Sequence, residues 1–253
     1  MKAILAISRR ETAAYFSSPI GWICLVLFAL LSGLFFSIMI VGTAVQAAEM
    51  GGMGGEENLT EMIVQGMFGN LSVVALLLMP ALTMGLIAQD RRDRSIELLL
   101  TSPISSLSIV LGKFLGGLGF AAVMVATTAY IPAVMYWLGD PDSGVMIANY
   151  AGFMALMAVF VAIGLFTSSL TDNQLVALAM GFTINLTVWI IGWLGQILPV
   201  DKGKAVVEHL ALLTHFEEFS KGVLHTRDAV YFVTVILFLL FATTQRVEAL
   251  RWR

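Results

Sequence analysis

A cluster of residues that could support bond-making chemistry falls between residues 199 and 228. His209, His215 and His225 lie there, interspersed with glutamates. Histidine and carboxylate side chains can bind zinc, but their spacing here fits no usual zinc pattern. We therefore favour amphipathic helices for this segment over a metal site, and we predict no metal.

No enzyme motif occurs in the sequence. There is no phosphate-binding loop of the Walker type, no Gly-x-Ser-x-Gly and no His-Glu-x-x-His. Apart from Lys113 near the start of one run, the apolar runs contain essentially none of the charged residues that ion-coupled transporters place inside the membrane. An intramembrane enzyme and a secondary transporter are both disfavoured. We predict no catalytic residue and no bound cofactor, so any movement must draw its energy from a partner.

Residues 89–108 are placed to receive that energy, because they form a charged stretch between two long apolar runs. The charged part is followed by a short amphipathic segment and then by a Thr-Ser-Pro turn, which ends a helix. Such a helix either lies on the bilayer surface or docks onto another protein, and we predict docking onto a separate motor. The predicted contact residues are Asp90, Arg91, Arg92, Arg94, Glu97, Leu99, Leu100, Thr101 and Pro103.

The composition defines the environment of these residues. Of the 253 residues, 58% are hydrophobic and 12% are charged, and the mean hydropathy is +0.89. Soluble domains carry about 25% charged residues. The single cysteine, Cys24, lies in an apolar run and allows no intramolecular disulfide. The chain is therefore predicted to be an integral membrane protein.

Six apolar runs have about the 20 residues that a helix needs to cross the hydrocarbon core, or nearly so. They are Ile20–Val45, Met67–Ala88, Ile109–Leu138, Ala148–Leu170, Leu175–Leu198 and Ala229–Thr244. Residues 1–253 are thus predicted to be one all-α, polytopic domain. In the third run, Gly112, Gly116, Gly117 and Gly119 favour close helix packing over a role in a substrate path.

The distribution of basic residues predicts the orientation. Ten of the fourteen Lys and Arg residues lie at the two termini or in the loop between the second and third runs. The first loop on the other side contains Glu49, Glu56, Glu57 and Glu61 without a Lys or Arg. By the positive-inside rule, both termini are predicted to be cytoplasmic.

Two further segments are predicted to be helical. Residues 2–16 favour a helix lying in the membrane interface over an unstructured basic tail. Its marker residues are Ile4, Leu5, Arg9, Arg10, Tyr15 and Phe16. In the outer loop, residues 199–228, helical spacing of apolar residues favours short helices that dip into the outer leaflet. We predict an outer gate or a partner contact there, made by His215, Phe216, Glu217 and Phe219.

The stretch DRRDRSIELLLTSPISSLSIVLGKFLG resembles a segment of type-2 ABC permeases that commonly reads E-x-x-x-G-T-x-E-x-L-L-T-x-P and ends on Gly-Lys or Ser-Lys. The matching residues are Glu97, Leu99, Leu100, Thr101, Pro103, Ile104, Gly112 and Lys113. Asp90 and Ser95-Ile96 depart from it, since Glu and Gly-Thr are frequent there. SRRETAAYFSSPIGWICLVLFALLSGLFF and HFEEFSKGVLHTRDAVYFVTVILFLLFAT resemble the gliding-motility-type branch of these permeases.

This resemblance implies six transmembrane helices, an N-terminal interfacial elbow helix, a coupling helix after the second span and outer re-entrant helices before the sixth. It also implies a bacterial inner membrane location and two permease subunits, as a homodimer or a heterodimer. Two cytoplasmic ABC ATPases would hold ATP and magnesium, and their closure would drive alternating access in an exporter. Members of this branch resemble systems with a single-anchor extracytoplasmic accessory protein. The mildly polar interior and the long outer segment, residues 199–228, suggest a second hypothesis, which is force transmission to an outside partner without solute transport. Apart from these proteins we expect contact with the lipid bilayer and none with nucleic acid.

Overall fold

The computed structural model describes residues 2–49, 57–96, 104–139, 141–197, 211–222 and 225–251. All regular elements in these ranges are helices, and six of them are long and apolar enough to cross a membrane. The predicted all-α polytopic fold is therefore confirmed. The helices are α1 Lys2–Ser17, α2 Pro19–Glu49, α3 Glu57–Thr83, α4 Ala88–Arg92, α6 Ser106–Ala126, α7 Tyr130–Leu138, α8 Ser143–Leu170, α9 Gln174–Ile197, α11 Leu212–Ser220 and α12 Thr226–Arg251.

Helix α8 is the centre of the bundle. It packs against α3, α6, α9, α11 and α12, and every residue from Leu156 to Leu165 is buried. A helix that is apolar on all sides is stable only when neighbours surround it. Helix α2 is the opposite case, because it exposes a row of large side chains that includes Trp22, Ile23 and Leu30. A lipid bilayer is the solvent that such a surface requires.

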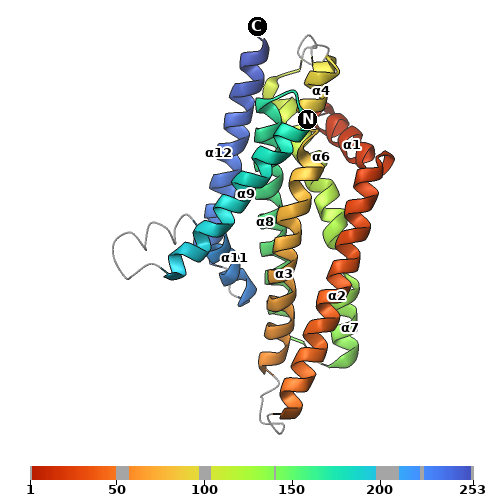
Figure 1. The fold of residues 1–253 in the computed structure, drawn as a ribbon, viewed down its shortest axis with the longest axis vertical. Helices are drawn as coiled ribbons and strands as arrows, with labels where there is room; N and C mark the ends of the chain where they lie inside the picture. Colours follow the sequence, from red (N-terminus) through yellow and green to blue (C-terminus); the bar gives the residue numbers. More distant parts are fainter. Residues whose placement is uncertain are drawn as a thin grey trace.

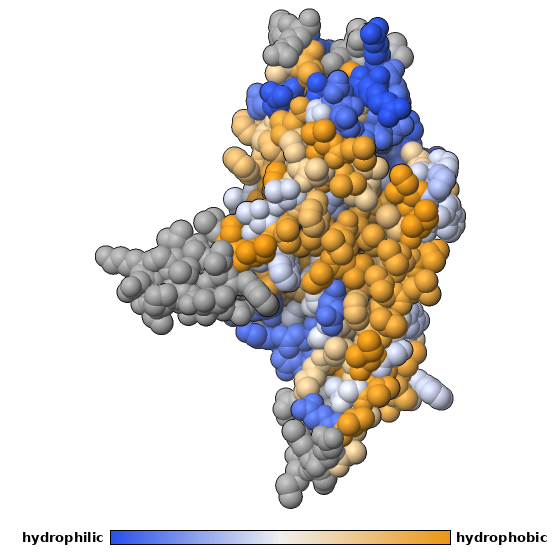
Figure 2. Space-filling model, in the orientation of Figure 1, coloured by the Kyte–Doolittle hydropathy of each residue, from blue (hydrophilic) through white to orange (hydrophobic). Residues whose placement is uncertain are grey.

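The two chain ends lie at the same end of the bundle, together with α1 and α4 (Figure 1). This end carries most of the hydrophilic surface visible in Figure 2, and below it the molecule is largely hydrophobic. An even number of spans places both termini on one side of a membrane, as the sequence predicts. That this side is cytoplasmic stays a prediction from the positive charges.

A row of glycines on α6 forms the surface on which α1 packs. A Cβ atom at Gly112 would lie 2.7 Å from the Ile7 side chain, and one at Gly116 would lie 2.5 Å from Glu11 Cβ. Since neither glycine has a Cβ, the two helix backbones approach closely. Thr12 Oγ1 also donates a hydrogen bond of 3.1 Å to the Gly116 carbonyl. The row therefore acts in packing.

The third span contains a break between α6 and α7 at residues 127–129. Tyr150, on α8, forms hydrogen bonds to this break. Its hydroxyl donates to the Thr128 carbonyl at 2.9 Å and accepts from Thr128 Oγ1 at 3.0 Å. A transmembrane helix tolerates a break where neighbouring side chains satisfy the freed backbone groups.

We expect Gly116→Val to destabilise the protein, because the added atoms would push α1 away from α6. Overpacking of this kind costs about 1–3 kcal/mol, and the thermal unfolding midpoint of a chain of this size falls by roughly 2–4 °C per kcal/mol. Thermal unfolding in detergent micelles measures the shift. The control is Gly69→Val on α3, where a Cβ would meet nothing within 4 Å. Equal shifts in the two variants would contradict the assignment of the glycine row to α1.

Candidate functional site

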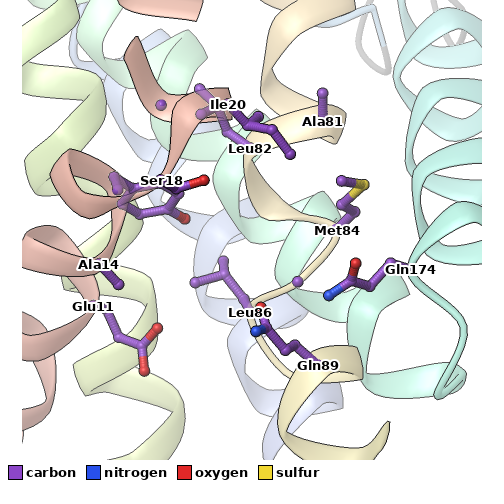
Figure 3. Close-up of a pocket in the computed structure, with 13 residues that line it drawn as sticks. Glu11, Ala14, Ser18, Ile20, Ala81, Leu82, Met84, Leu86, Gln89 and Gln174 are labelled. Atoms are coloured by element: carbon purple, nitrogen blue, oxygen red, sulfur yellow. The ribbon is translucent and has the colours of Figure 1, made fainter. Parts of the chain in front are cut away.

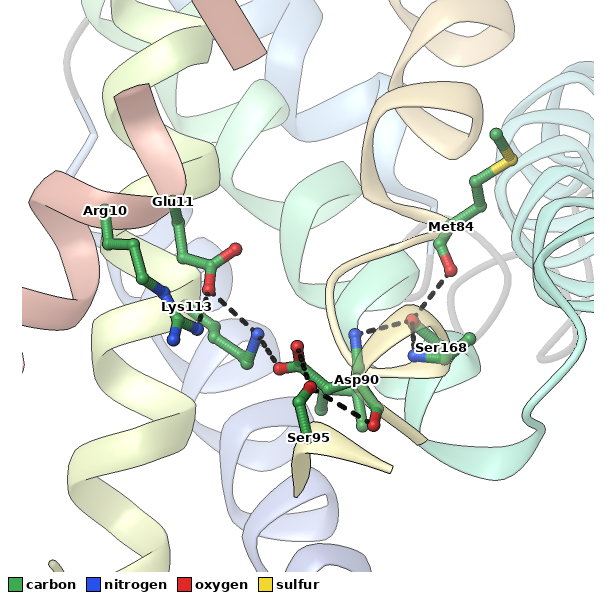
Figure 4. Close-up of polar contacts among 9 residues, drawn as sticks. Arg10, Glu11, Met84, Asp90, Ser95, Lys113 and Ser168 are labelled. Carbon is green, nitrogen blue, oxygen red and sulfur yellow. Dashed lines mark hydrogen bonds and ion pairs between the residues drawn. The ribbon is translucent and has the colours of Figure 1, made fainter. Parts of the chain in front are cut away.

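The charged end of the bundle is built around the junction of α3 and α4. Pro80 lies in the last turn of α3, and the chain runs through turns from Met84 to Ile87 before α4 begins. Ser168 on α8 supplies hydrogen-bond partners for the backbone of this junction. Its Oγ accepts from the N–H groups of Ile87 and Ala88, both at 2.9 Å, and donates to the Met84 carbonyl at 2.8 Å (Figure 4). One buried hydroxyl thus fixes the start of α4 to the central helix.

Helix α4 contains the first part of the predicted coupling segment. Arg91 Nη1 donates to the Ser169 carbonyl at 3.0 Å, so this arginine points back to α8. Arg92 and Arg94 are exposed, and Arg94 has a left-handed backbone with φ of 56°. The other predicted contact residues, Glu97, Leu99, Leu100, Thr101 and Pro103, lie outside the described residues. Of the predicted contact residues that the structure describes, Arg92 and Arg94 are the exposed ones.

A buried ion triad joins this segment to two other helices. Lys113 on α6 has a side chain only 2% exposed, and its Nζ lies 2.6 Å from Asp90 Oδ2 on α4 and 2.9 Å from Glu11 Oε1 on α1 (Figure 4). Asp90 Oδ1 also accepts from Ser95 Oγ at 3.0 Å. Arg10 completes the group with a 2.7 Å bond to the same Glu11 oxygen, which raises the pKa of Arg10.

The charges of this group balance, since two carboxylates face one ammonium and one guanidinium. Removing one partner from a buried ion pair is strongly destabilising because it leaves an uncompensated charge. Lys113 therefore requires both Asp90 and Glu11, and it holds α1, α4 and α6 in one relative position. Lys113 lies at the start of a span as the sequence indicates, but it is buried and paired rather than facing the surface.

The predicted elbow helix exists as α1, although a different set of side chains fixes it. Tyr15 stacks on Phe120 with ring centroids 4.7 Å apart, and Ile7 is buried against α6. Ile4 is half-buried, while Leu5, Arg9 and Phe16 are exposed. The face that packs on α6 thus contains Ile7, Glu11 and Tyr15. The exposed Leu5 and Phe16 stay available to lipid, so the interfacial location stays a prediction.

A pocket of about 140 Å³ adjoins the triad (Figure 3). Its walls come from α1, the start of α2, the end of α3 and its junction with α4, and the first residue of α9. Its polar lining residues are Glu11, Tyr15, Ser18, Gln89 and Gln174. Leu82, Leu86 and Ile20 contribute the apolar part. The triad and the pocket share Glu11.

The predicted outer residues anchor α11 to the bundle. His215 Nδ1 lies 2.6 Å from Asp228 Oδ1 on α12, and both side chains are 6% exposed. Phe216 and Phe219 are buried in the core, while Glu217 is half-buried and burial raises its pKa. Their role as a gate or partner contact stays a prediction. Within the described ranges, no group of three His, Cys, Asp or Glu residues could hold a metal ion.

This arrangement is suited to transmitting movement. Ion pairs link α4 to α1 and α6 through Lys113, and hydrogen bonds link it to α8 through Ser168. Sequence reasoning missed the roles of Glu11 and Ser168. The signal available for Glu11 was its helical spacing of four residues from Ile7 and from Tyr15, which puts a charge on an apolar helix face. Ser168 has no local signal.

The fold and this charged end define a polytopic helical membrane protein with its hydrophilic surface gathered mainly at one end. Residues 5–244 match the family model described as ABC-2 family transporter protein. The chain belongs to this family, and it is the membrane permease subunit of an ABC transporter, which associates with a separate ABC ATPase. Among curated proteins none matches the sequence. The match does not test the gliding-motility-type branch, which stays a prediction.

We expect Lys113→Met to destabilise the protein by about 3 kcal/mol, at the lower end for a broken buried pair because both carboxylates keep some exposure. The loss should shrink when Glu11→Gln and Asp90→Asn are added, since the one charge of the group that then remains is Arg10, whose side chain is 55% exposed. The unfolding midpoint measures both effects. Lys221→Met is the control, because Lys221 pairs with Glu218 at the surface and its side chain is 49% exposed. A Lys113→Met variant as stable as the control would contradict the triad's structural role.

Ser168→Ala should destabilise the protein by about 1–3 kcal/mol, because it leaves backbone groups of Met84, Ile87 and Ala88 without their partner. Ser169→Ala is the matched control on the same helix, since the Ser169 hydroxyl bonds only the Phe166 carbonyl of its own helix. Hydrogen exchange of residues 84–92 should be faster in Ser168→Ala alone. Equal protection in both variants would show that Ser168 does not hold the junction.

Proposed function

We propose that this permease is part of an ATP-driven exporter, and that α4 receives the movement of a cytoplasmic ATPase. The observation that supports this most directly is the Asp90–Lys113–Glu11 triad, because it connects the predicted coupling segment to two other helices through bonds of 2.6 and 2.9 Å. A push on α4 that preserves these bonds must also displace α1 and α6. The charged end then faces the cytoplasm of a bacterial cell.

The second connection runs into the centre of the bundle. Arg91 and the α3–α4 junction are bonded to Ser169 and Ser168 at the end of α8. Since α8 also contacts α3, α6, α9, α11 and α12, movement of this end reaches most of the subunit. Packed elements of this kind move as units between discrete arrangements.

In the proposed cycle, two permease subunits pair and two ATPases dock beneath them. ATP and magnesium bind in the ATPases, and their closure favours one of two permease conformations. Nucleotide binding can shift that equilibrium only by its differential affinity for the two states. The coupling segment supplies this difference if it binds the closed ATPase pair more tightly than the open one.

The test reverses two exposed arginines, Arg92 at the end of α4 and Arg94 just after it. Arg92→Glu with Arg94→Glu should reduce the ATPase that co-purifies with the tagged permease from native membranes by about tenfold or more, which corresponds to a loss of about 1.4 kcal/mol. Both side chains point away from the bundle, so insertion and stability should stay unchanged. Quantitative mass spectrometry of the purified complex gives the ratio of ATPase to permease.

Arg246→Glu is the control, because Arg246 is an exposed arginine near the C-terminal end of α12. It should retain the ATPase. If the double variant retains the ATPase equally well, or if the unaltered permease purifies without one, α4 is not the coupling element.

A second candidate is force transmission to an extracytoplasmic partner without solute transport. It is favoured by the firm attachment of α11: the His215–Asp228 pair joins α11 to α12, and Asn149 of α8 donates to the Ser220 carbonyl at 3.0 Å. Movement of α8 would therefore carry α11 with it. Release of an extracytoplasmic partner by Asn149→Leu, with the ATPase still bound, would favour this candidate over export.

A further inference from the structure

The pocket beside the triad contains polar groups that have no partner in the protein. The Tyr15 hydroxyl is inaccessible to solvent and makes no hydrogen bond within the described structure. Burial and the neighbouring Glu11 raise its pKa, so it stays a donor. This hydroxyl faces Gly117 of α6, where a Cβ would lie 3.7 Å from it, so it is not one of the groups that a ligand in the pocket can reach.

Three further side chains around the pocket have open hydrogen-bonding capacity. For Ser18 Oγ and the amides of Gln89 and Gln174, the described part of the chain supplies no bond. The two amides lie close together over Gly85, where a Cβ would be 3.3 Å from Gln89 Oε1 and 3.5 Å from Gln174 Nε2. Figure 3 places them opposite Glu11 and Ser18 across the pocket. Donors on one side therefore face a carboxylate on the other.

The electrostatics of the pocket select against an anion. Glu11 is its one acidic lining residue, and no Lys or Arg is among the lining residues. Lys113 and Arg10 both bind Oε1 of Glu11, which leaves Oε2 without a partner among the described residues. A free carboxylate oxygen binds a donor most strongly when the donor is cationic.

The pocket borders the lipid-facing surface. Ile20 lines it and is 43% exposed, and the neighbouring Trp22 and Ile23 of α2 are 52% and 63% exposed. Its volume of about 140 Å³ is some ten times the roughly 10–15 Å³ that one ordered water requires. An amphiphile can thus place its head in the pocket and its chains along α2.

We propose that this pocket binds the head group of phosphatidylethanolamine. The ammonium donates to Glu11 Oε2, and the phosphate oxygens accept from the Ser18 hydroxyl and from the amides of Gln89 and Gln174. Phosphatidylcholine has the same net charge but no N–H donor, and phosphatidylglycerol has hydroxyl donors but a net negative charge. Because its walls include α1 and α9, the bound lipid ties these two helices together.

The experiment measures lipid retention by the full-length permease alone, so it needs neither an ATPase nor a solute. The protein is placed in nanodiscs with equal amounts of the three phospholipids, and native mass spectrometry counts the lipids that stay bound. Phosphatidylethanolamine should be retained in preference to both others. Gln174→Leu removes a donor to the phosphate and should weaken retention by roughly tenfold. Ala14→Phe fills the pocket from an exposed position on α1 and should abolish it.

Gln245→Leu is the matched control, because Gln245 is an exposed glutamine on α12 near the same end of the bundle. It should retain the lipid as the unaltered protein does. Equal retention of the three lipids, preference for phosphatidylglycerol, or retention that survives both pocket variants would overturn the assignment. A permease that shows one of these results but still recruits an ATPase through α4 would leave the proposed function intact.

Discussion

The burial of one ammonium group between two carboxylates is the constraint on which the charged end of this protein depends. Lys113 cannot stay in the bundle unless Asp90 and Glu11 both face it, since an unpaired charge in a low-dielectric interior is strongly unfavourable. The three residues come from three helices, of which α1 is far in the sequence from α4 and α6. Their mutual requirement fixes the elbow helix, the coupling segment and the third span as one body, and the glycines of α6 allow α1 to come close enough to take part.

The second constraint is the absence of water from the membrane interior, which obliges every interrupted helix to find partners for its backbone. The two interruptions are both closed from α8, by Ser168 at the α3–α4 junction and by Tyr150 at the α6–α7 break. Helix α8 therefore does more than fill the core, because its side chains also bond to the backbone groups that the two interruptions leave free. Consequently the direction in which α4 leaves the second span is fixed. The proposed docking onto an ATPase requires such a fixed direction.

As a membrane permease subunit of the ABC-2 family, this chain works together with a separate ABC ATPase. Several of its polar groups connect one helix to another. At the charged end, ion pairs connect α1, α4 and α6. Away from that end, a hydrogen bond connects α11 to α8, and a buried His–Asp pair connects it to α12. Beside the ion triad lies a pocket whose hydrogen-bond donors have no partner among the described residues. The lipid that we propose to bind there would connect the bilayer to this end of the bundle.

The sequence by itself determined the fold class, the six spans and the location of a charged segment after the second span. These features follow from hydropathy and local charge, and the membrane imposes them on each segment separately. The sequence also indicated that α6 packs closely through its glycines, but not against which helix. Only the tertiary structure decided that Ile7 rather than Leu5 packs on α6, that Ser168 holds α4, and that Lys113 pairs with Glu11 and Asp90. The contacts of Ser168 with α4 and of Lys113 with Glu11 join residues 80 and 102 positions apart, and Lys113 and Asp90 lie in different helices. No local pattern contains the partner of such a contact.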